Sequence, residues 1–254
     1  MEGKLHRYFV RMGFMGSAYH GWQIQEKSDS IQGETENAFS LLLREKIRLT
    51  GAGRTDTGVH AKEFYAHFDT HTEPGHIREM NLVYKLNRLL PQTIAIYSVI
   101  PVKPKAHARF DATDRTYQYF ICTRKDPFYH DRAWLFERPL DIDLMQKAAD
   151  LLKGKDDFSS FARSNTQVKT NICTVNNAVW QKQEHILVFK INADRFLRNM
   201  VRSIVGTLVS AGLEKLTTDD FRSIIKARDR SRAGYSAPAC GLYLTGVKYP
   251  AGTF

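Results

Sequence analysis

The sequence predicts an α+β fold in which two similar domains carry mostly antiparallel sheets with helices packed on one side. Strand-like segments come in hairpin-like pairs and do not alternate strictly with helices, a pattern typical of antiparallel sheets. Both halves of the 254-residue chain mix strands and helices in this way, and the length suits two ordinary domains. Two such halves facing each other would leave a cleft between them.

The first half shows both the strand and the helix periodicity. Alternating apolar and polar residues predict a strand over 6–14, with Arg7 and Arg11 on its polar face. Apolar residues at helical spacing predict a helix over 31–45. Further along we expect a strand at 64–69, a helix at about 77–90 that ends before Pro91, and a β-branched strand at 93–100.

The stretch 101–109 holds two prolines and three basic residues and predicts the crossing between domains. We therefore expect one domain over 1–104 and a second over 105–254. The second domain is predicted to contain strands at 115–122, 172–180, 185–193 and 241–249, and a helix at 141–153 that Asp141 caps. A long helix is predicted from Arg195 to Gly212, and another opens at Thr217 with Asp220 in the Asp form of a capping box.

The charge of the chain favours an anionic partner. Its 37 Lys and Arg against 27 Asp and Glu give a net charge of +10, which is typical of proteins that bind nucleic acid. No long apolar run and no signal peptide occur, so we expect no membrane association and a cytoplasmic location. Cys122, Cys173 and Cys240 form no CxxC or CxxH pair, and ATP-loop and dinucleotide signatures are missing. The sequence therefore predicts no metal site, no disulfide framework and no cofactor.

The segment 51–61, GAGRTDTGVHA, is the most unusual part of the sequence. Its three glycines allow sharp turns and close backbone approach, and they flank Arg54 and Asp56. A phosphate-binding loop fits poorly, because the GxxxxGK[ST] pattern is missing and a central carboxylate would repel phosphate. An ordinary turn, with Asp56 bonded to its own backbone, is the plain alternative to a functional loop.

Six blocks of the sequence, in chain order, resemble the signature segments of the tRNA pseudouridine synthase A family. These are GSAYHGWQIQ at 16–25, GAGRTDTGVHA at 51–61, LNRLLP at 86–91, ARF at 108–110 with RTY at 115–117, FLRNMVRSIVG at 196–206 and APACGLYL at 237–244. They span nearly the whole chain and weigh against the ordinary turn. Met15 departs from the family's usual Asp or Asn, and Asp156 stands where a His is common.

The resemblance implies a cofactor-independent isomerase that converts uridine to pseudouridine at positions 38, 39 and 40 of the tRNA anticodon stem-loop. It also implies a homodimer that tRNA spans, and a basic active-site cleft between the two domains. The reaction breaks the N1–C1′ bond, rotates the base and rebuilds the link through C5, and the resemblance makes Asp56 the nucleophile. Attack on C6 of the base and attack on C1′ of the ribose both remain open.

The resemblance implies roles for three more side chains. Arg202 is expected to keep the Asp56 carboxylate charged and oriented. Arg54 is expected to fill the space that the flipped uridine leaves, with a phosphate contact as the alternative. Tyr117 is expected to stack on the flipped uracil and is a candidate for removing the C5 proton.

The remaining candidates carry weaker signals. Leu242 lies beneath the base in the family, although a strand leucine is ordinarily a core residue. Arg195 and Arg198 share one side of the predicted helix with Arg202, and they contact RNA or form a solvated basic face. His20 and His60 are interpreted as structural or RNA-facing, not as acid–base groups.

Two other functions compete with the isomerase. One is a tRNA-binding module without catalysis, which loss of the loop Asp or its Arg partner would favour, and the sequence retains both. The other is a nucleoside-cleaving hydrolase that uses Asp56. The hydrolase would release free uracil and change the mass of the RNA, whereas isomerisation leaves the mass unchanged.

Overall fold

In a computed structural model, which describes residues 4–26, 28–163 and 170–254, the chain divides into two compact units. The first unit contains the residues up to Thr113 together with Leu244–Phe254, and the second contains Asp114–Tyr243. The sequence predicted a boundary between residues 104 and 105. The chain divides later because residues 105–113 pack on the first unit, and its C-terminal segment returns to that unit through β10 (Leu242–Lys248).

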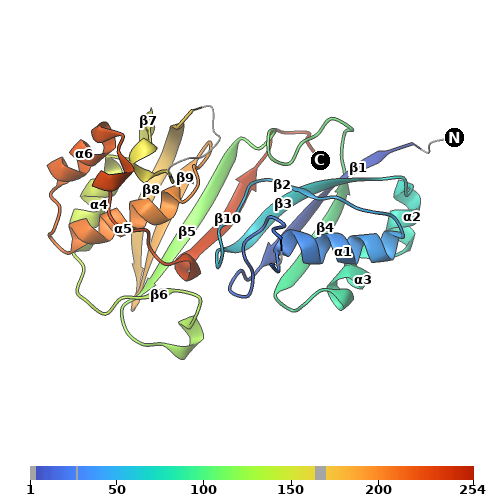
Figure 1. Ribbon diagram of the computed structural model, residues 1–254, viewed down its shortest axis with the longest axis horizontal. Helices are drawn as coiled ribbons and strands as arrows, with labels where there is room; N and C mark the ends of the chain where they lie inside the picture. Colours follow the sequence, from blue (N-terminus) through green and yellow to red (C-terminus); the bar gives the residue numbers. More distant parts are fainter. Residues whose placement is uncertain (1–3, 27, 164–169) are drawn as a thin grey trace. The chain divides into compact units, whose positions relative to one another are not determined.

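The first unit is built on an antiparallel arrangement of strands (Figure 1). Its strands are β1 (His6–Phe14), β2 (Thr50–Gly51), β3 (His60–Thr70) and β4 (Ile94–Pro101), in which β1 lies between β4 and β3 and β2 pairs with β3. Its helices are α1 (Ile31–Leu43), α2 (Pro74–Glu79) and α3 (Leu82–Leu89). The predicted strand over 6–14 is confirmed, and so are a helix from Ile31 and strands near 64–69 and 93–100.

Helices cover one face of these strands. Tyr8, Val10, Met12 and Phe14 are buried on that face at alternate positions of β1. The ring of Phe39 in α1 lies 4.9 Å from that of Phe68 in β3, and Phe68 lies 5.4 Å from Tyr8. The aromatic contacts explain why the period-two pattern of the sequence folds as a strand with one face against α1.

The other face of the strands is covered by the crossing segment and the C-terminal segment. The ring of Phe9 lies 5.4 Å from Tyr249 and 5.8 Å from Phe254. Tyr249 donates its hydroxyl to the carbonyl of Ala108 at 2.6 Å. Both faces of the first unit are therefore packed, and residues from the end of the chain complete one of them.

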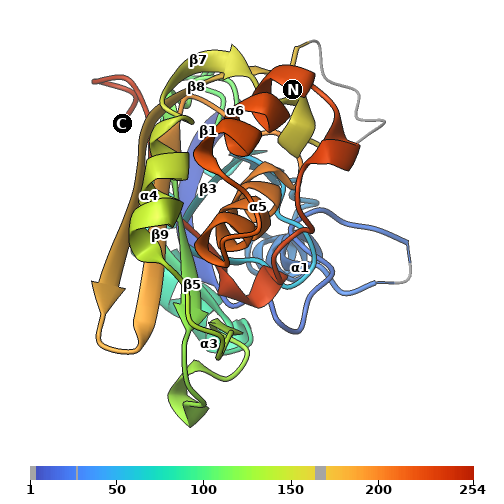
Figure 2. The ribbon, with the colours of Figure 1, turned by 90° about the vertical axis from the view of Figure 1, so that its left-hand side faces the viewer.

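The second unit has strands in the order β5-β9-β8-β7, all antiparallel. They are β5 (Asp114–Cys122), β7 (Gly154–Asp157), β8 (Ile172–Gln183) and β9 (Ile186–Ala193), and a short β6 (Trp134–Leu135) pairs parallel with β5. The helices α4 (Ile142–Asp150), α5 (Met200–Gly212) and α6 (Thr218–Ala227) gather on one side of these strands (Figure 2). The mixed, mostly antiparallel fold predicted from the sequence is confirmed.

Two predicted helices are shorter than their apolar periodicity indicates. The helix expected at 77–90 is divided into α2 and α3, because Asn81 adopts a left-handed conformation with φ of 52°. The helix expected from Arg195 begins only at Met200, because Asn199 has φ of 65°. The predicted caps are confirmed, since Asp141 accepts from the backbone of Leu144 and Thr217 forms a capping box with Asp220.

His67 is the most perturbed titratable group in the packing of the first unit. It is buried, its Nδ1 accepts the N–H of Ala108 at 3.1 Å, and its ring lies 4.6 Å from His107. Burial, together with the nearby charges of Arg7 and His107, lowers the pKa of His67 to about 4, although Asp69 and Asp111 oppose this. The folded chain therefore holds His67 neutral.

We expect the free energy of unfolding to fall as the pH is lowered from about 6.5 toward 4. In this range His67 becomes protonated in the unfolded chain but stays neutral in the folded chain. Between pH 7.5 and pH 5 the loss should be about 1 kcal/mol once solvent screening is allowed for. Urea unfolding at both pH values measures it. His67→Gln should reduce this pH dependence, whereas the exposed control His20→Gln should keep it, and equal dependence in both variants would contradict the assignment.

Candidate active site

The loop that carries Asp56 connects β2 to β3 in the first unit. Arg54 is exposed and Asp56 is half-buried. The carbonyl of Asp56 accepts the N–H of Val59 at 3.2 Å, and Gly58 has φ of 79°. The segment thus makes a tight turn directly after Asp56, and the side chain of Arg54 is exposed to solvent.

A second segment, residues 16–22, holds this loop through the main chain. Trp22 donates its N–H to the carbonyl of Thr55 at 3.4 Å, and Gly58 donates to the carbonyl of Tyr19 at 3.4 Å. The N–H of Gly16 binds Nδ1 of His60 at 3.0 Å. Two of the six sequence blocks that resemble one family are therefore adjacent in the fold, although 25 residues separate them in the chain.

The close approach of these two segments requires glycine. A Cβ atom at Gly16 would lie 2.0 Å from the carbonyl oxygen of Val59. A Cβ atom at Gly21 would lie 2.3 Å from the carbonyl oxygen of Thr55, and Gly21 has φ of 90°. Any larger residue at either position would push the loop away.

Aromatic side chains anchor residues 16–22 to the core. Trp22 is buried with its ring 4.3 Å from Phe64, and Tyr19 shares a 2.8 Å hydroxyl hydrogen bond with Thr93. Met15, which departs from the family pattern, uses its backbone N–H to bind the carbonyl of Thr93 at 2.8 Å. In the sequence, Tyr19 and Trp22 stood out only as parts of a motif. Their contacts show that they fix residues 16–22 to the core of the first unit.

The two histidines near the loop differ in their surroundings. His60 is fully buried and accepts a hydrogen bond from Gly16, so of the two roles left open by the sequence, structural or RNA-facing, it has the structural one. His20 is exposed, and its carbonyl accepts the side-chain amide of Gln25 at 2.8 Å.

The second unit carries the other predicted residues. Tyr117 lies on β5 opposite Ile191 of β9, and its ring meets that of Phe196 edge-on at 5.1 Å. Leu242 is buried at the start of β10. The backbone N–H of Arg195 binds the carboxylate of Asp194 at 2.7 Å. Phe196 therefore links Tyr117 to the segment that contains Arg195.

Arg195 and Arg198 do not share a helix with Arg202, contrary to the prediction. They precede Met200, the first residue of α5, and Arg198 accepts the N–H of Arg163 at its carbonyl at 3.0 Å. The helical spacing in the sequence therefore carries no information about which way these two side chains point. The left-handed Asn199 separates them from Arg202.

Arg202 lies in the first turn of α5 and is bound to a distant segment. Its Nε donates to the carbonyl of Ala237 at 2.7 Å, and the N–H of Ala237 donates back to the carbonyl of Arg202 at 3.0 Å. Tyr119, fully buried on β5, donates its hydroxyl to the next carbonyl, that of Pro238, at 2.7 Å. Burial raises the pKa of Tyr119, which keeps this hydroxyl as a donor.

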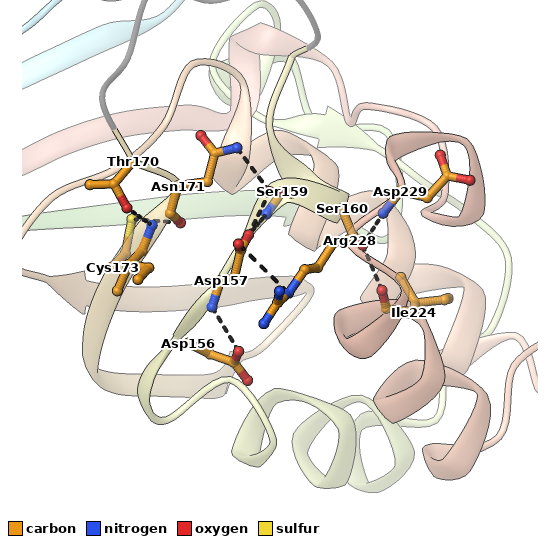
Figure 3. Close-up of polar contacts among 11 residues, drawn as sticks. Asp156, Asp157, Ser159, Ser160, Thr170, Asn171, Cys173, Ile224, Arg228 and Asp229 are labelled. Atoms are coloured by element: carbon orange, nitrogen blue, oxygen red, sulfur yellow. Dashed lines mark hydrogen bonds and ion pairs between the residues drawn. The ribbon is translucent and has the colours of Figure 1, made fainter.

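A polar cluster that the sequence analysis did not predict surrounds Asp157 (Figure 3). Its carboxylate accepts the backbone N–H and the hydroxyl of Ser159, and it lies 3.7 Å from Nε of Arg228. Burial opposes ionisation, but these partners outweigh it and lower the pKa of Asp157. Asp156, the second departure from the family pattern, is exposed and accepts the N–H of Asp157 at 2.7 Å. The cluster ties β7 to the end of α6.

Across residues 4–26, 28–163 and 170–254, we find no group of three or more His, Cys, Asp or Glu side chains arranged to hold a metal ion. In the same part of the chain, each helix is too short or too polar to cross a membrane.

Comparison with known proteins identifies relatives over the full length of the chain. The family model of tRNA pseudouridine synthase matches residues 148–250. The chain is 48% identical over 246 residues to tRNA pseudouridine synthase A of Parabacteroides distasonis, with 97% of each chain covered. It is 50% identical over 247 residues to the protein of that name from Bacteroides fragilis, again with 97% of each covered. The corresponding protein of Thermoanaerobacter pseudethanolicus is 40% identical over 247 residues, which cover 96% of this chain and all of that one.

A solved structure, the crystal structure of a Cbf5-Nop10-Gar1 complex, contains a chain with 9% identity and a TM-score of 0.36, over 97% of this chain and 58% of that one. This resemblance is too weak to bear on the fold or the function. The full-length relatives, by contrast, define a class of RNA-modifying isomerases. The chain belongs to the tRNA pseudouridine synthase A family, and the resemblance seen in its six sequence blocks is confirmed.

We expect Gly16→Ala to disturb the Asp56 loop, because the new Cβ would meet the carbonyl oxygen of Val59 at 2.0 Å. The free energy of unfolding should fall by about 1–3 kcal/mol, and turnover should fall about tenfold or more as Asp56 shifts. Urea unfolding and a tRNA pseudouridine assay measure the two effects.

Gly53→Ala is the matched control in the same loop. A Cβ at Gly53 would find no described atom within 4 Å, so its stability should change by less than about 0.5 kcal/mol. If both variants behaved alike, the close contact at Gly16 would not be what holds the loop.

Proposed function

We propose that the chain isomerises uridine at positions 38, 39 and 40 of the tRNA anticodon stem-loop, without a cofactor, through Asp56. Conversion of tRNA uridine to pseudouridine is the activity of the family to which the chain belongs. The reaction exchanges the N1–C1′ bond for a C5–C1′ bond, while C5 loses a proton and N1 gains one. The positions and the residue roles are the proposed part.

The observation that carries the proposal is the fixed position of the Asp56 loop. Backbone contacts with residues 16–22 hold it on both sides of Asp56, at Thr55 and at Gly58. Half-burial leaves the carboxylate reachable by a nucleoside. A nucleophile needs such positioning, because a small displacement from the reacting atom slows the reaction strongly.

Arg202 is the proposed ionic partner of Asp56. Its Nε is bound by Ala237, so pairing with a carboxylate would use the two terminal nitrogens of the guanidinium. A cation beside a sheltered carboxylate offsets the loss of hydration and keeps it negative. Both residues lie in blocks shared with the family.

Tyr117 and Arg54 are proposed to handle the flipped uridine. Extrusion of the base from the stem costs about a few kcal/mol, and stacking on an aromatic ring returns about 1–3 kcal/mol. Tyr117 supplies an aromatic ring on β5, and its plane stands at 86° to that of Phe196. The exposed guanidinium of Arg54, two residues from Asp56, suits the vacated space in the RNA.

The remaining assignments rest on the family resemblance. Arg195 and Arg198 are proposed to contact phosphates, and Leu242 to support the base from below. Residues 193–232 hold nine Lys and Arg against five Asp and Glu, which favours such contacts. We also propose a homodimer that tRNA spans, located in the cytoplasm where tRNA is found.

Asp56→Asn should abolish turnover, by about a thousandfold or more, while tRNA affinity stays within about threefold, because the amide keeps the shape but not the nucleophile. Carbodiimide-adduct stops in reverse transcription of unmodified tRNA count pseudouridine, and filter binding measures affinity. Asp143→Asn, an exposed carboxylate in the first turn of α4, serves as the control and should be fully active.

The same assay separates the competing functions. Wild-type protein that released free uracil would be a hydrolase, and wild-type protein that bound tRNA without product would be a binding module. Full turnover by Asp56→Asn would remove Asp56 from the mechanism.

Tyr117→Phe tests whether the hydroxyl takes part in proton removal. If Tyr117 only stacks, the variant should turn over within about threefold of wild type, whereas Tyr117→Ala should weaken substrate use by about tenfold to a hundredfold. Single-turnover rates on one tRNA substrate measure both. A loss in Tyr117→Phe as large as that in Tyr117→Ala would assign the proton chemistry to the hydroxyl.

A further inference from the structure

Residues 230–238 lie against the first turns of α5 with their backbone in direct contact with the helix. A Cβ at Gly206 of α5 would lie 1.8 Å from the carbonyl oxygen of Tyr235. Gly234 donates its N–H to the hydroxyl of Thr207 at 2.9 Å, and a Cβ at Gly234 would lie 3.1 Å from the backbone of Thr207. The helix and the segment therefore pack backbone against backbone.

This contact determines the orientation of Arg202. Nε of Arg202 donates to the carbonyl of Ala237, and Ala237 donates its N–H back to the carbonyl of Arg202. Because Nε lies in the plane of the guanidinium, a hydrogen bond from it sets the direction in which the terminal nitrogens point. Any shift of Ala237 would therefore turn the guanidinium.

Ser236, the residue before Ala237, joins three parts of the chain. Its Oγ accepts Nδ2 of Asn199 at 2.6 Å and Nη2 of Arg230 at 3.1 Å. Nδ2 of Asn199 also donates to Oγ of Ser203 in α5 at 3.0 Å. The Ser236 hydroxyl thus links Asn199, which caps α5, to Arg230 at the start of the 230–238 segment. Ser236 itself precedes Ala237, the partner of Arg202.

Arg230 stiffens the turn that leads to Ser236. Its Nη1 donates to the carbonyl of Gly234 at 3.0 Å and to that of Ala233 at 3.4 Å. One guanidinium therefore binds two carbonyls and one hydroxyl over four residues of chain. Removal of the hydroxyl would leave Nη2 of Arg230 without this acceptor and Nδ2 of Asn199 with Ser203 alone, and the segment would relax to satisfy these donors.

We infer that Ser236 is a positioning residue for the isomerisation: with Asn199 and Arg230 it fixes Ala237 and so aims the guanidinium of Arg202. The inference rests on the proposed pairing of Arg202 with Asp56. It assigns a role in turnover to three residues that act through Arg202.

Ser236→Ala tests the inference through single-turnover rates at saturating tRNA. The rate should fall about tenfold to a hundredfold, with tRNA affinity changed less than twofold, because the guanidinium is misdirected while the RNA surface is intact. Ser236→Thr keeps a hydroxyl and should stay within threefold of wild type. Ser210→Ala removes a hydroxyl from α5 about two helical turns after Arg202. It is the matched control, and its rate should equal that of the wild type. No loss in Ser236→Ala, or no rescue by Thr, would overturn the inference.

Arg202→Lys shows whether Ser236 acts through Arg202. Lysine keeps the charge but has no Nε donor for Ala237, so adding Ser236→Ala to Arg202→Lys should slow the reaction less than twofold further. An equal loss in both backgrounds would overturn the inference alone. Full activity of Arg202→Lys by itself would instead overturn the proposed role of Arg202, and the inference with it.

A second readout does not depend on activity. The Nε–H signal of Arg202 in a proton–nitrogen spectrum, assigned by its loss in Arg202→Lys, should exchange slowly with solvent in the wild-type protein. In Ser236→Ala it should exchange at least tenfold faster, and in Ser210→Ala at the wild-type rate. Unchanged exchange in Ser236→Ala would overturn the inference.

Discussion

Close packing of main chain against main chain at Gly16 and Gly21 is the constraint on which the Asp56 loop depends. Between β2 and β3 the loop has no helix or strand of its own, and residues 16–22 bind its backbone at Thr55 and Gly58. A side chain at either glycine would occupy the position of a carbonyl oxygen of the loop. The position of Asp56 is thus determined by the dimensions of the backbone, which vary far less than side-chain rotamers do.

The second unit uses the same device at Gly206. Arg202 lies one helical turn before this glycine, and the 230–238 segment meets the helix there. In both units an irregular segment gains a defined position because glycine lets it lie directly on its neighbour. The proposed reaction requires such rigidity, because Asp56 and Arg202 can act together only when both side chains are held in place.

Sequence periodicity predicted the elements whose pattern reflects burial, such as β1 and β5, and the caps at Asp141 and Thr217. It overextended the helix before Met200 and joined α2 to α3, because a single left-handed residue, Asn199 or Asn81, leaves no trace in an apolar pattern. Asp56, Arg202 and Tyr117 became candidates through the family resemblance, not through spacing. No sequence pattern pointed to Ser236 as a positioning residue. Its partners Asn199 and Arg230 lie in separate segments, and only the fold brings these polar side chains together.

The return of the chain through β10 has a consequence for synthesis on the ribosome. Tyr249 and Phe254 pack on Phe9 and Tyr65, so part of one face of the N-terminal unit stays uncovered until residues 249–254 emerge. At about 5–20 residues per second, the intervening second unit takes on the order of ten seconds to translate. During that interval the nascent N-terminal unit exposes the aromatic rings of Phe9 and Tyr65, which the returning segment covers only later.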